Sequence, residues 1–474
     1  MDDNRIKLMI LGMGLVGNSL LSLLVQEQLF GTEDILVVDQ SSSNFALYEA
    51  MGGSPANRIE ICINGQNYAD LLDHLDAGDL LIALAIDLDY STMLAECLKR
   101  GIHFICAADD TFYDDAVSDR DVQATDEEND HAEQIHYEAS RRAGQLYKEA
   151  CTSIMQFGCN PGLISILTKK ALQDIVREDK GDFVSANRSE LLEMLEKGKY
   201  PALAARLQIR SMIETDIDTT ETDFREEPNA LYSTWSGPEF EWEMNRHAIF
   251  RVGVFDTPLS VLSRMHQENQ KILAYLPETG TVILEAQAKN VRMKWSGAEG
   301  LHEVCMLPHE ELVSIYDYYS IRDAEGHITY APNVLFLYHP SPLAMRSLQR
   351  PENDHYITIT REHMRSGSET VGITLTGDRF SPRYVRTVLT IDEEKVYTPY
   401  HGYTRLSREE LKNTTPTILQ VSVPLFAAIK YILRHPNEGV LFAEDISPEE
   451  ILSEIERYLP IYSGEEPSGH FYDS

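Results

Sequence analysis

A glycine-rich hexad near the N-terminus constrains this chain more than any other feature. Residues 12–17, Gly-Met-Gly-Leu-Val-Gly, follow an apolar run from Ile6 to Leu11 that has the character of a buried strand. The hexad opens an apolar helix through Leu24, and a second strand, Ile35 to Asp39, comes next. A Gly-x-Gly-x-x-Gly in this context is typical of dinucleotide-binding domains. The alternative, a glycine-rich turn that only packs, leaves the spacing of these elements unexplained.

Each position of the hexad has a physical role in that interpretation. Gly12 allows the tight turn, Gly14 lets the backbone approach a pyrophosphate, and Gly17 lets helix and strand pack closely. The first residues of the helix, Leu15 and Val16, would offer their free N–H groups to the phosphates. The hexad therefore predicts a phosphate-binding loop.

Two carboxylates are candidates for further cofactor contacts. Asp39 would accept hydrogen bonds from the ribose 2′-hydroxyl, and it would repel a 2′-phosphate. No Arg follows among residues 40–43, so NAD is favoured over NADP. Asp87 comes after the buried strand 79–84, at the carboxyl edge where ligands bind in open parallel sheets.

The charge balance excludes some classes of partner. The chain of 474 residues has 76 acidic and 41 basic side chains, a formal charge of -35, which disfavours nucleic acid and anionic membranes. Cationic ligands are admissible, although an acidic surface also serves solubility. The six cysteines lack C-x-x-C spacing, which argues against zinc and a disulfide framework. With no signal segment and no apolar run of membrane-spanning length, we expect a cytosolic protein.

The order of elements predicts an α/β fold, a Rossmann-type doubly wound parallel sheet with a second α+β substrate domain. Residues 1–160 form the NAD-binding domain, residues 161–390 the substrate domain, and residues 391–474 a C-terminal segment that returns to pack on the first domain. Strands of a mixed or antiparallel sheet are expected at Phe250–Val254, Thr281–Ala286 and Val334–Tyr338. Helices are expected at Leu419–Arg434 and Pro448–Leu459.

The junction between the first two domains has two distinctive segments. Residues 114–133 are strongly acidic and predict a solvated loop, because the alternation and central glycine of an EF-hand are missing. No metal is predicted there. A helix, His136–Ala150, and a strand, Ser153–Phe157, lead to the turn Gly158–Gly162, in which Pro161 fixes φ and the flanking glycines would let a ligand approach the backbone closely.

Three features of the substrate domain are candidates for function. Glu214 lies in a moderately apolar strand, Trp235 precedes a Gly-Pro turn with Glu243 close behind, and His309 precedes a predicted strand, Leu312–Ile315. Each has an ordinary structural alternative: a solvated acid, a packing aromatic and a hydrogen-bonded core histidine.

The combined motifs resemble those of bacterial homospermidine synthases, within the saccharopine-dehydrogenase-like superfamily, over nearly the whole chain. The motifs that carry this resemblance are residues 12–17, 158–162, Ser233–Ser236, His309–Ile315, Tyr338–Pro340, Ser366–Gly367 with Gly372, and Arg405–Ser407.

The resemblance implies an unusual dehydrogenase chemistry. NAD takes a hydride from putrescine, the imine loses ammonia as a second amine condenses, and the hydride returns to the new imine. The cofactor is recycled, a small-molecule diamine or polyamine is the substrate, and a homodimer is implied.

The resemblance also assigns roles to residues. Trp235 would hold a cationic intermediate over its ring, Glu243 would anchor the distal amine, and Glu214 would lie at the reacting end. Asn160 would face the nicotinamide and the substrate, and His309 would carry a proton.

Two acids depart from the family's pattern. The family has a Cys-Ile-Glu-Pro-Trp stretch where this chain has Ala-Asp-Asp-Thr-Phe at residues 108–112, so the equivalent acid is Asp110. Where the family has Asp after Ser-Gly, this chain has Glu369. Both replacements keep the negative charge but change the length of the side chain. They therefore affect the identity of the substrate more than the class of reaction.

Two other functions remain open. One is a saccharopine- or carboxynorspermidine-type NAD(P)-dependent reductase, whose carboxylated substrate would call for Arg or Lys. The candidate motifs are instead rich in acids, with Arg246 the nearest exception. The other is an NAD-binding protein that has lost catalysis, with the acidic segment serving a basic partner.

Overall fold

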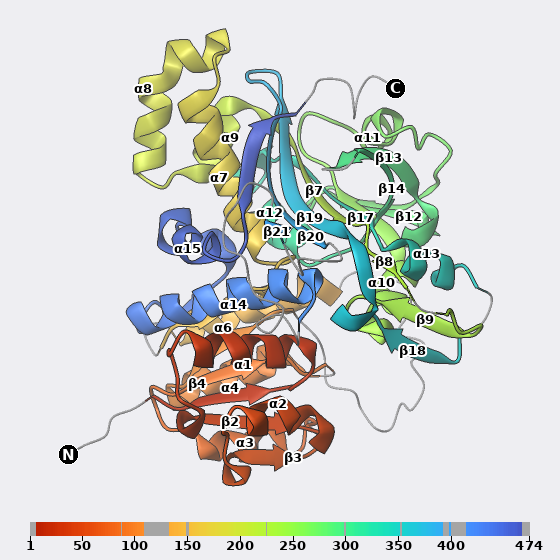
Figure 1. Cartoon of the computed structure of the whole chain (residues 1–474). Coiled ribbons are helices and arrows are strands. Elements are labelled where there is room, and N and C mark those ends of the chain that lie inside the picture. Colours follow the sequence, from red (N-terminus) through yellow and green to blue (C-terminus); the bar gives the residue numbers. More distant parts are fainter. Residues whose placement is uncertain are drawn as a thin grey trace.

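Two large sheets organise the molecule in a computed structural model of the chain (Figure 1). The structure describes residues 6–86, 88–108, 132–147, 151–223, 225–297, 300–350, 353–391, 398–399 and 414–466. Asp87, Asp110, nearly all of the acidic segment 114–133, and Arg405–Ser407 lie outside these residues.

The first sheet is parallel throughout. Its strands are β1 (Leu8–Leu11), β2 (Ile35–Asp39), β3 (Arg58–Glu60), β4 (Leu80–Ala83), β5 (His103–Cys106), β6 (Ser153–Ile154) and β22 (Val440–Leu441). Within the described ranges their order is β22-β6-β5-β4-β1-β2-β3, and every adjacent pair is parallel. All residues of β1, β4 and β5 are buried, as expected for strands covered on both faces. The predicted doubly wound parallel sheet is confirmed.

Helices cover both faces of this sheet. They are α1 (Leu15–Gln26), α2 (Ala46–Ala50), α3 (Tyr68–Leu71), α4 (Tyr90–Arg100) and α6 (Ala132–Leu146). Asp89 accepts a hydrogen bond from Thr92 N and so caps the start of α4. Gly101, which follows the last helical residue, has the left-handed conformation that is common at helix ends. The helix α6 begins four residues before the predicted start at His136 and ends at Leu146, ahead of the predicted Ala150.

The second sheet is mixed. Its strands are β7 (Ile209–Asp218), β8 (Glu221–Thr222), β10 (His247–Arg251), β11 (Ile272–Leu276), β12 (Thr281–Gln287), β13 (Arg292–Gly297), β14 (Gly300–Met306), β17 (Asn333–His339), β19 (Met364–Gly377), β20 (Arg383–Ile391), β21 (Thr398–Pro399) and β23 (Ile461–Glu465). The long β7 lies between β17, parallel to it, and β19, antiparallel to it. The expectation of a mixed sheet is confirmed, although β10 ends at Arg251, before the predicted Val254. Small strand pairs are β15 (Ile321–Arg322) with β16 (Ile328–Tyr330) and β9 (Ala230–Ser233) with β18 (His355–Thr358).

The helices of this part are α7 (Leu163–Glu178), α8 (Asp182–Glu196), α9 (Tyr200–Leu207), α10 (Gly237–Asn245), α11 (Pro258–Arg264), α12 (Glu311–Tyr319) and α13 (Pro342–Leu348). The helix α7 packs on β19 and β20, and α12 packs on β17. Helices also lie between the two sheets: α12 contacts α6 of the parallel sheet.

The C-terminal segment joins both sheets. The helix α14 (Pro416–Arg434) crosses between them and packs on α1, and the segment continues through β22 of the parallel sheet, α15 (Pro448–Ile455) and β23 of the mixed sheet (Figure 1). Ser19 of α1 and Ser422 of α14 bring their buried hydroxyl oxygens within 2.8 Å. The domain boundaries at residues 160 and 390 stay predictions.

Three sequence predictions are corrected by these elements. Residues 312–315 belong to the helix α12, not to a strand, because a short, mostly apolar run does not distinguish a buried helix from a buried strand. The Gly-Pro pair at 237–238 opens α10 instead of a turn, with Ser236 as its cap and Pro in the first turn. Third, α14 is long and apolar enough to span a membrane, but 78% of its apolar window is buried in the protein, so it is a core helix.

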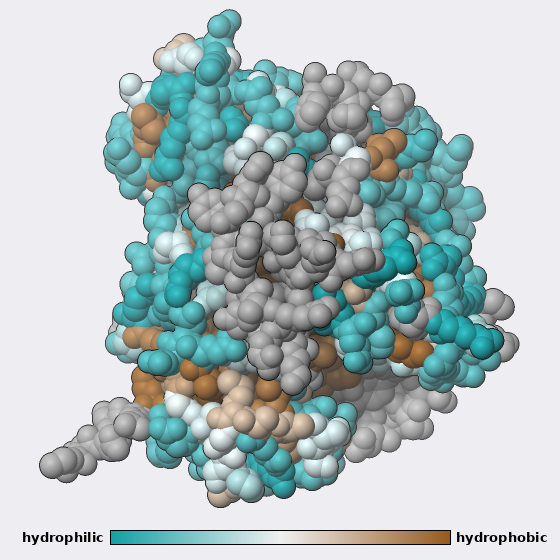
Figure 2. Space-filling view, in the orientation of Figure 1, coloured by the Kyte–Doolittle hydropathy of each residue, from teal (hydrophilic) through white to brown (hydrophobic). Residues whose placement is uncertain are grey.

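Hydrophilic residues cover most of the face in Figure 2, and apolar residues gather mainly on its lower part, on the side of the parallel sheet. This distribution agrees with the formal charge of -35.

Candidate functional site

The glycine loop has the geometry that its spacing predicts. Gly12 has φ +94°, and a Cβ there would lie 2.6 Å from Ala85 N. A Cβ on Gly17 would lie 2.1 Å from the carbonyl oxygen of Gly12, so the loop closes only because both are glycine. A Cβ on Gly14 would meet nothing within 4 Å. The loop thus leaves open space above Gly14, where a pyrophosphate would lie at the N-terminus of α1.

Asp39, at the end of β2, lies beside this loop. Its Oδ2 accepts from Met13 N at 2.7 Å, and its Oδ1 accepts from Ser41 N at 2.8 Å and Asn44 Nδ2 at 3.0 Å. A carboxylate has about four acceptor positions, so one remains for a ligand hydroxyl. Asp39 therefore fixes the loop and can still contact a ribose.

The mixed sheet contributes a row of acids. Glu214, Asp216 and Asp218 alternate along β7 with Thr215 and Ile217, so the three carboxyl groups share one face of the sheet. We call these three residues the β7 acidic row. The opposite face belongs to an apolar core that includes Ile213 and Ile217. All three acids of the row are buried.

Neighbouring strands extend this face of the sheet. The register places Phe336 and Tyr338 of β17 beside Glu214 and Asp216, and it places Glu369 of β19 beside Asp218. The Phe336 and Tyr338 rings stack with centroids 6.2 Å apart. Thr417 of α14 donates its hydroxyl to Glu369 Oε2 at 2.6 Å. The row is thus flanked by an aromatic wall on one side and a fourth acid on the other.

Among the described residues, these carboxyl groups form no ion pair with Lys or Arg. The charge of His309 lowers the pKa values of Glu214 and Asp216, and that of His339 lowers the pKa of Asp218, but burial outweighs both. Burial and the nearby Glu311 raise the pKa of Glu214 well above its usual range. Burial and Asp218 raise the pKa of Asp216 to about 7. Burial likewise raises the pKa of Asp218, and that of Glu369 well above its usual range. A bound cation would let these groups ionise.

A histidine lies at the Glu214 end of the row. His309 contacts Glu311 at the start of α12, and its Nδ1 lies 2.9 Å from Glu310 Oε2. Although burial opposes it, Glu311 and Glu310 raise the pKa of His309 well above its usual range. In turn, although burial would raise it, His309 holds the pKa of Glu311 below its usual range. The two acids therefore favour the protonated form of His309. His309, Glu310 and Glu311 also form a group of three ligand-type side chains that could hold a metal ion.

Glu243 approaches the same histidine from α10. Its Oε1 lies 3.8 Å from His309 Nε2, and burial raises its pKa to about 8. Arg246, on the same side of the site, pairs with Glu133 of α6. This arginine is thus engaged by an acid near the end of the predicted acidic segment.

Asn160 connects the acidic row to the parallel sheet. It follows β6, whose carboxyl end lies at the same sheet edge as the glycine loop after β1, and its Nδ2 donates to Asp216 Oδ2 at 3.3 Å. The Asn160–Pro161 peptide is cis, and the turn is closed by Gly158 N donating to Pro161 O at 2.8 Å. Asn160 therefore links the acidic row to the edge of the parallel sheet that also carries the glycine loop.

Trp235 lies on the aromatic side of the row. Its Nε1 donates to the Tyr338 hydroxyl at 3.4 Å, and its ring meets Phe240 edge to face, with centroids 6.3 Å apart. Because Tyr338 is adjacent to Asp216, Trp235 joins the wall that borders the acids.

The structure brings together six of the predicted site residues and adds others. Asn160, Glu214, Trp235, Glu243, His309 and Glu369 gather at this junction, whereas Asp110 and Asp87 are outside the described residues. Sequence reasoning missed Asp216, Asp218, Glu311 and Thr417. The signal for the first two was present, because acids at every second position of a strand place charge on one face only.

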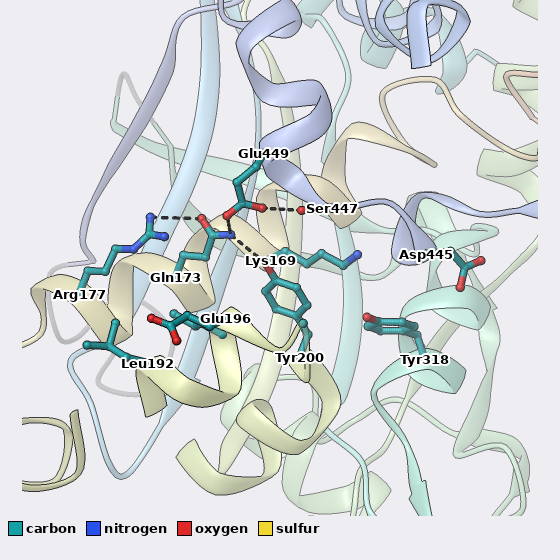
Figure 3. Close-up of a pocket in the computed structure, with 12 residues that line it drawn as sticks. Lys169, Gln173, Arg177, Leu192, Glu196, Tyr200, Tyr318, Asp445, Ser447 and Glu449 are labelled. Atoms are coloured by element: carbon teal, nitrogen blue, oxygen red, sulfur yellow. Dashed lines mark hydrogen bonds between the residues drawn. The ribbon is translucent and has the colours of Figure 1, made fainter. Parts of the chain in front are cut away.

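A separate cavity of about 640 Å3 lies away from these acids (Figure 3). It is lined by residues of α7, α8, α9 and α12 and by the C-terminal segment, including Lys169, Tyr200 and Tyr318. Lys169 Nζ donates to the carbonyl oxygens of Glu444 (2.5 Å) and Ile446 (2.6 Å), and burial lowers its pKa to about 8. These bonds hold the C-terminal segment against α7.

Comparison with known proteins was consistent with this geometry. Residues 8–154 match the family described as saccharopine dehydrogenase NADP binding domain. The homospermidine synthase of Mesorhizobium japonicum is 22% identical over 470 residues, covering 95% of this chain and 88% of that protein. That of Blastochloris viridis is 23% identical over 466 residues, covering 95% and 89%.

The chain resembles homospermidine synthases along nearly its whole length. The resemblance predicted from the motifs is thus confirmed. Among solved structures, the homospermidine synthase of Legionella pneumophila in complex with NAD has a TM-score of 0.78 at 19% identity, covering 98% of this chain and 92% of that one. Saccharopine dehydrogenase (L-Glu forming) of Saccharomyces cerevisiae follows with a TM-score of 0.50 at 12% identity, covering 97% and 100%. These structures share the fold of this chain.

Proposed function

We propose that the protein is an NAD-dependent homospermidine synthase, which transfers an aminobutyl group from putrescine, or from spermidine, to putrescine. One observation carries the proposal: among the described residues, several buried carboxyl groups without a Lys or Arg ion pair lie beside an aromatic wall, and Asn160 links them to the edge of the parallel sheet that carries the glycine loop. Burying uncompensated charge costs several kcal/mol per group, and a diamine supplies the missing positive charges.

The reaction balances without an external oxidant or reductant. One putrescine loses a hydride and a proton and becomes an imine, the imine exchanges its ammonia for a second putrescine, and the new C=N bond takes up the hydride and a proton. The products are one homospermidine and one ammonia. Bound NAD would supply the hydride acceptor and donor for the two redox half-steps.

The residues of this chain bind, orient and move protons. Glu214 and Glu243 would hold ammonium groups, and the faces of Trp235 and Tyr338 would stabilise cationic intermediates. Asn160 would orient the reacting carbon through its amide. His309, held as a cation by Glu310 and Glu311, would deliver a proton at its Nε2, the atom that faces Glu243.

The cofactor preference rests on Asp39. The matched family is named for NADP, and the Legionella pneumophila structure contains NAD. We infer NAD for this chain, because Asp39 would repel a 2′-phosphate and its oxygens already hold the loop. The cytosolic location and the homodimer stay predictions.

The test uses purified protein with NAD and putrescine, or with NADP in a parallel reaction, and amine analysis by mass spectrometry. We expect homospermidine and ammonia in equal amounts, with no lasting rise in NADH absorbance. Glu214→Gln should lower the rate at least about tenfold, since it removes a buried charge partner of the cation. Glu221→Gln, an exposed acid on β8, should not change it.

The outcomes separate the alternatives. Stoichiometric oxidation of the nicotinamide with a carboxylated amine would indicate a saccharopine-type reductase, and NAD binding with no amine product from putrescine or spermidine would indicate a protein without catalysis. Either result would overturn the proposal.

A further inference from the structure

A buried ion pair beside Glu243 carries an inference about which amines the site accepts, and this inference rests on the proposed function. Arg246 follows the last residue of α10, three residues after Glu243, so the two side chains start close together at the end of the helix. Glu133, in the first turn of α6, meets this arginine. The side chains of Arg246 and Glu133 are 5% and 13% exposed, so the pair is largely withdrawn from water.

Glu133 binds Arg246 with both of its carboxyl oxygens. Its Oε1 contacts Nη1 of the guanidinium group, and its Oε2 accepts from Nη2 at 3.1 Å. The guanidinium carbon also lies 4.4 Å from the centroid of the Trp242 ring. Two parallel N–H···O bonds are the arrangement that an arginine makes with any carboxylate, whether of a protein or of a ligand. Glu133 therefore occupies the position that a substrate carboxylate would take on Arg246.

Both members of this pair act on the amine site. Burial raises the pKa of Glu243 to about 8, and Arg246 is among the charges that oppose this shift. Although burial would raise it, Arg246 holds the pKa of Glu133 below its usual range, and His309 adds to this effect. The guanidinium group of Arg246 thus belongs to the charged surroundings of Glu243, the residue that we assign to the distal amine.

A diamine with a carboxylate on the carbon beside one nitrogen differs from putrescine only by that group. We propose that Glu133 determines specificity against such carboxylated diamines, because it occupies the guanidinium group of Arg246 that would otherwise bind their carboxylate. A carboxylate beside the distal ammonium group then meets Glu243 and Glu133, and like charges repel. Putrescine has no such group and is accepted.

A second buried arginine determines the effect that Glu133 has on putrescine. Arg251 of β10 donates from Nη1 to Thr279 O at 3.0 Å and from Nη2 to Oε1 of Gln134, the neighbour of Glu133, at 3.4 Å. Burial lowers the pKa of Arg251 to about 10, and Glu133 opposes this shift. Loss of the Glu133 charge would leave two arginines on this side of the site, which would attract an anionic group and repel a diamine.

The test is calorimetric titration of the NAD-loaded protein with putrescine and with 2,5-diaminopentanoate, its carboxylated counterpart. The wild type should bind putrescine at least about tenfold more tightly than 2,5-diaminopentanoate. Glu133→Gln keeps the size of the side chain and removes its charge. In this variant the affinity for 2,5-diaminopentanoate should rise at least about fivefold, and that for putrescine should fall about two- to fivefold.

Further variants separate recognition from packing. The doubly substituted Glu133→Gln, Arg246→Gln protein has neither charge, so the gain for 2,5-diaminopentanoate should disappear in it. Glu133→Asp keeps the charge but shortens its reach; it should shift the selectivity in the same direction by a smaller factor, and it replaces Glu133→Gln if that variant does not fold. Glu138→Gln, at an exposed acid five residues along α6, is the matched control and should change neither affinity. Circular dichroism establishes that each variant is folded.

Two results would overturn the inference. One is unchanged selectivity between the two amines in a folded Glu133 variant, including an equal loss of both affinities, which would indicate that the pair only supports packing. The other is a gain for 2,5-diaminopentanoate that persists after Arg246→Gln. The proposed function is judged separately, by homospermidine formation from putrescine. If homospermidine forms while the selectivity does not change, the function stands and the inference fails. If the selectivity changes without turnover, Glu133 stands as a specificity residue of an amine site and the proposed function fails.

Discussion

Asp216 and Glu243 hold protons at pH values where carboxyl groups are ordinarily ionised. Burial raises the pKa of Asp216 to about 7, with Asp218 and Glu311 adding to the shift and Asn160 and His309 opposing it. Burial raises the pKa of Glu243 to about 8, with Glu310 and Glu239 adding and His309 and Arg246 opposing. Both groups must lose a proton before they can hold a cation, whereas primary amines remain protonated to about pH 10.

Putrescine affinity should therefore increase between pH 6 and pH 8.5. Calorimetry of the NAD-loaded protein in two buffers of different ionisation enthalpy should also reveal protons released on binding. In Asp216→Asn the lower part of this pH dependence should disappear, because the group that titrates there is gone. A flat affinity profile with no proton release would show that these acids are already ionised or do not contact the amine.

Trp235 offers a second test at this scale. A cation over an indole gains about 0.5 to 2 kcal/mol, so Trp235→Ala should raise the KM for putrescine roughly 2- to 30-fold and leave NAD binding intact. Trp235→Phe keeps a ring but loses the N–H that contacts Tyr338, and it should recover much of the affinity. Tyr275→Ala, at an exposed aromatic on β11, is the matched control. Equal loss of amine and NAD binding would instead indicate a packing role for Trp235.

At the level of elements, the sequence predicted what depends on local pattern. Glycine spacing and the pattern of apolar residues were enough to predict the glycine hexad, β1 and β2. They also predicted the ends of α14 to within a few residues. The helix α12 was not predicted, because the short run from Leu312 to Ile315 is mostly apolar and buried, a pattern that helices and strands share. The partner of Glu214 could not be predicted either, since Glu311 comes from a distant segment of the chain. The role predicted for Asp110 stays a prediction, because this residue lies outside the described ranges.

A substitution of Lys169 would test how strongly the C-terminal segment is held against α7 (Figure 3). Its ammonium group satisfies the carbonyl oxygens of Glu444 and Ile446, while Glu444 Oε1 accepts from Ser165 of α7 and Ser314 of α12. Lys169→Met leaves two buried acceptors without donors and should destabilise the protein by about 2 to 5 kcal/mol. Chemical denaturation measures this loss. Lys197→Met removes only an exposed pair with Glu193 and should cost less than about 0.5 kcal/mol; a similarly small effect of Lys169→Met would contradict the assignment.

Across the whole molecule, the exposed and the buried acids have opposite preferences for the charged state. The exposed acids keep the protein hydrated, while Glu214 and Asp216 are buried and, among the described residues, have His309 rather than Lys or Arg as their nearby cation. Asp216, Glu243, Glu214 and Glu369 have folded-state pKa values above those of the unfolded chain, so the folded state binds more protons than the unfolded state between about pH 4 and pH 8. Their contribution to stability is complete below pH 4 and is lost as the pH rises through the folded pKa values.

The ligand-free protein should accordingly melt at a lower temperature at pH 8 than at pH 6, and saturating putrescine should remove most of that difference. Thermal denaturation with and without the diamine measures both effects. The doubly substituted Glu214→Gln, Asp216→Asn protein should show a smaller pH dependence and a smaller response to putrescine. A melting temperature that rises from pH 6 to pH 8 without ligand would mean that other groups dominate the balance.

The alternation of side chains along β7 has a consequence for how such an enzyme could change its substrate. Moving an acid by one residue would place it on the other face, among Ile213, Ile217 and the rest of that apolar core. The carboxyl groups on this face could therefore be moved along β7 only in steps of two residues, or extended and shortened by exchanging Asp and Glu at a fixed position. Evolution or design would thus change the positions of these charges in discrete steps, whereas a loop can shift a side chain by any small distance.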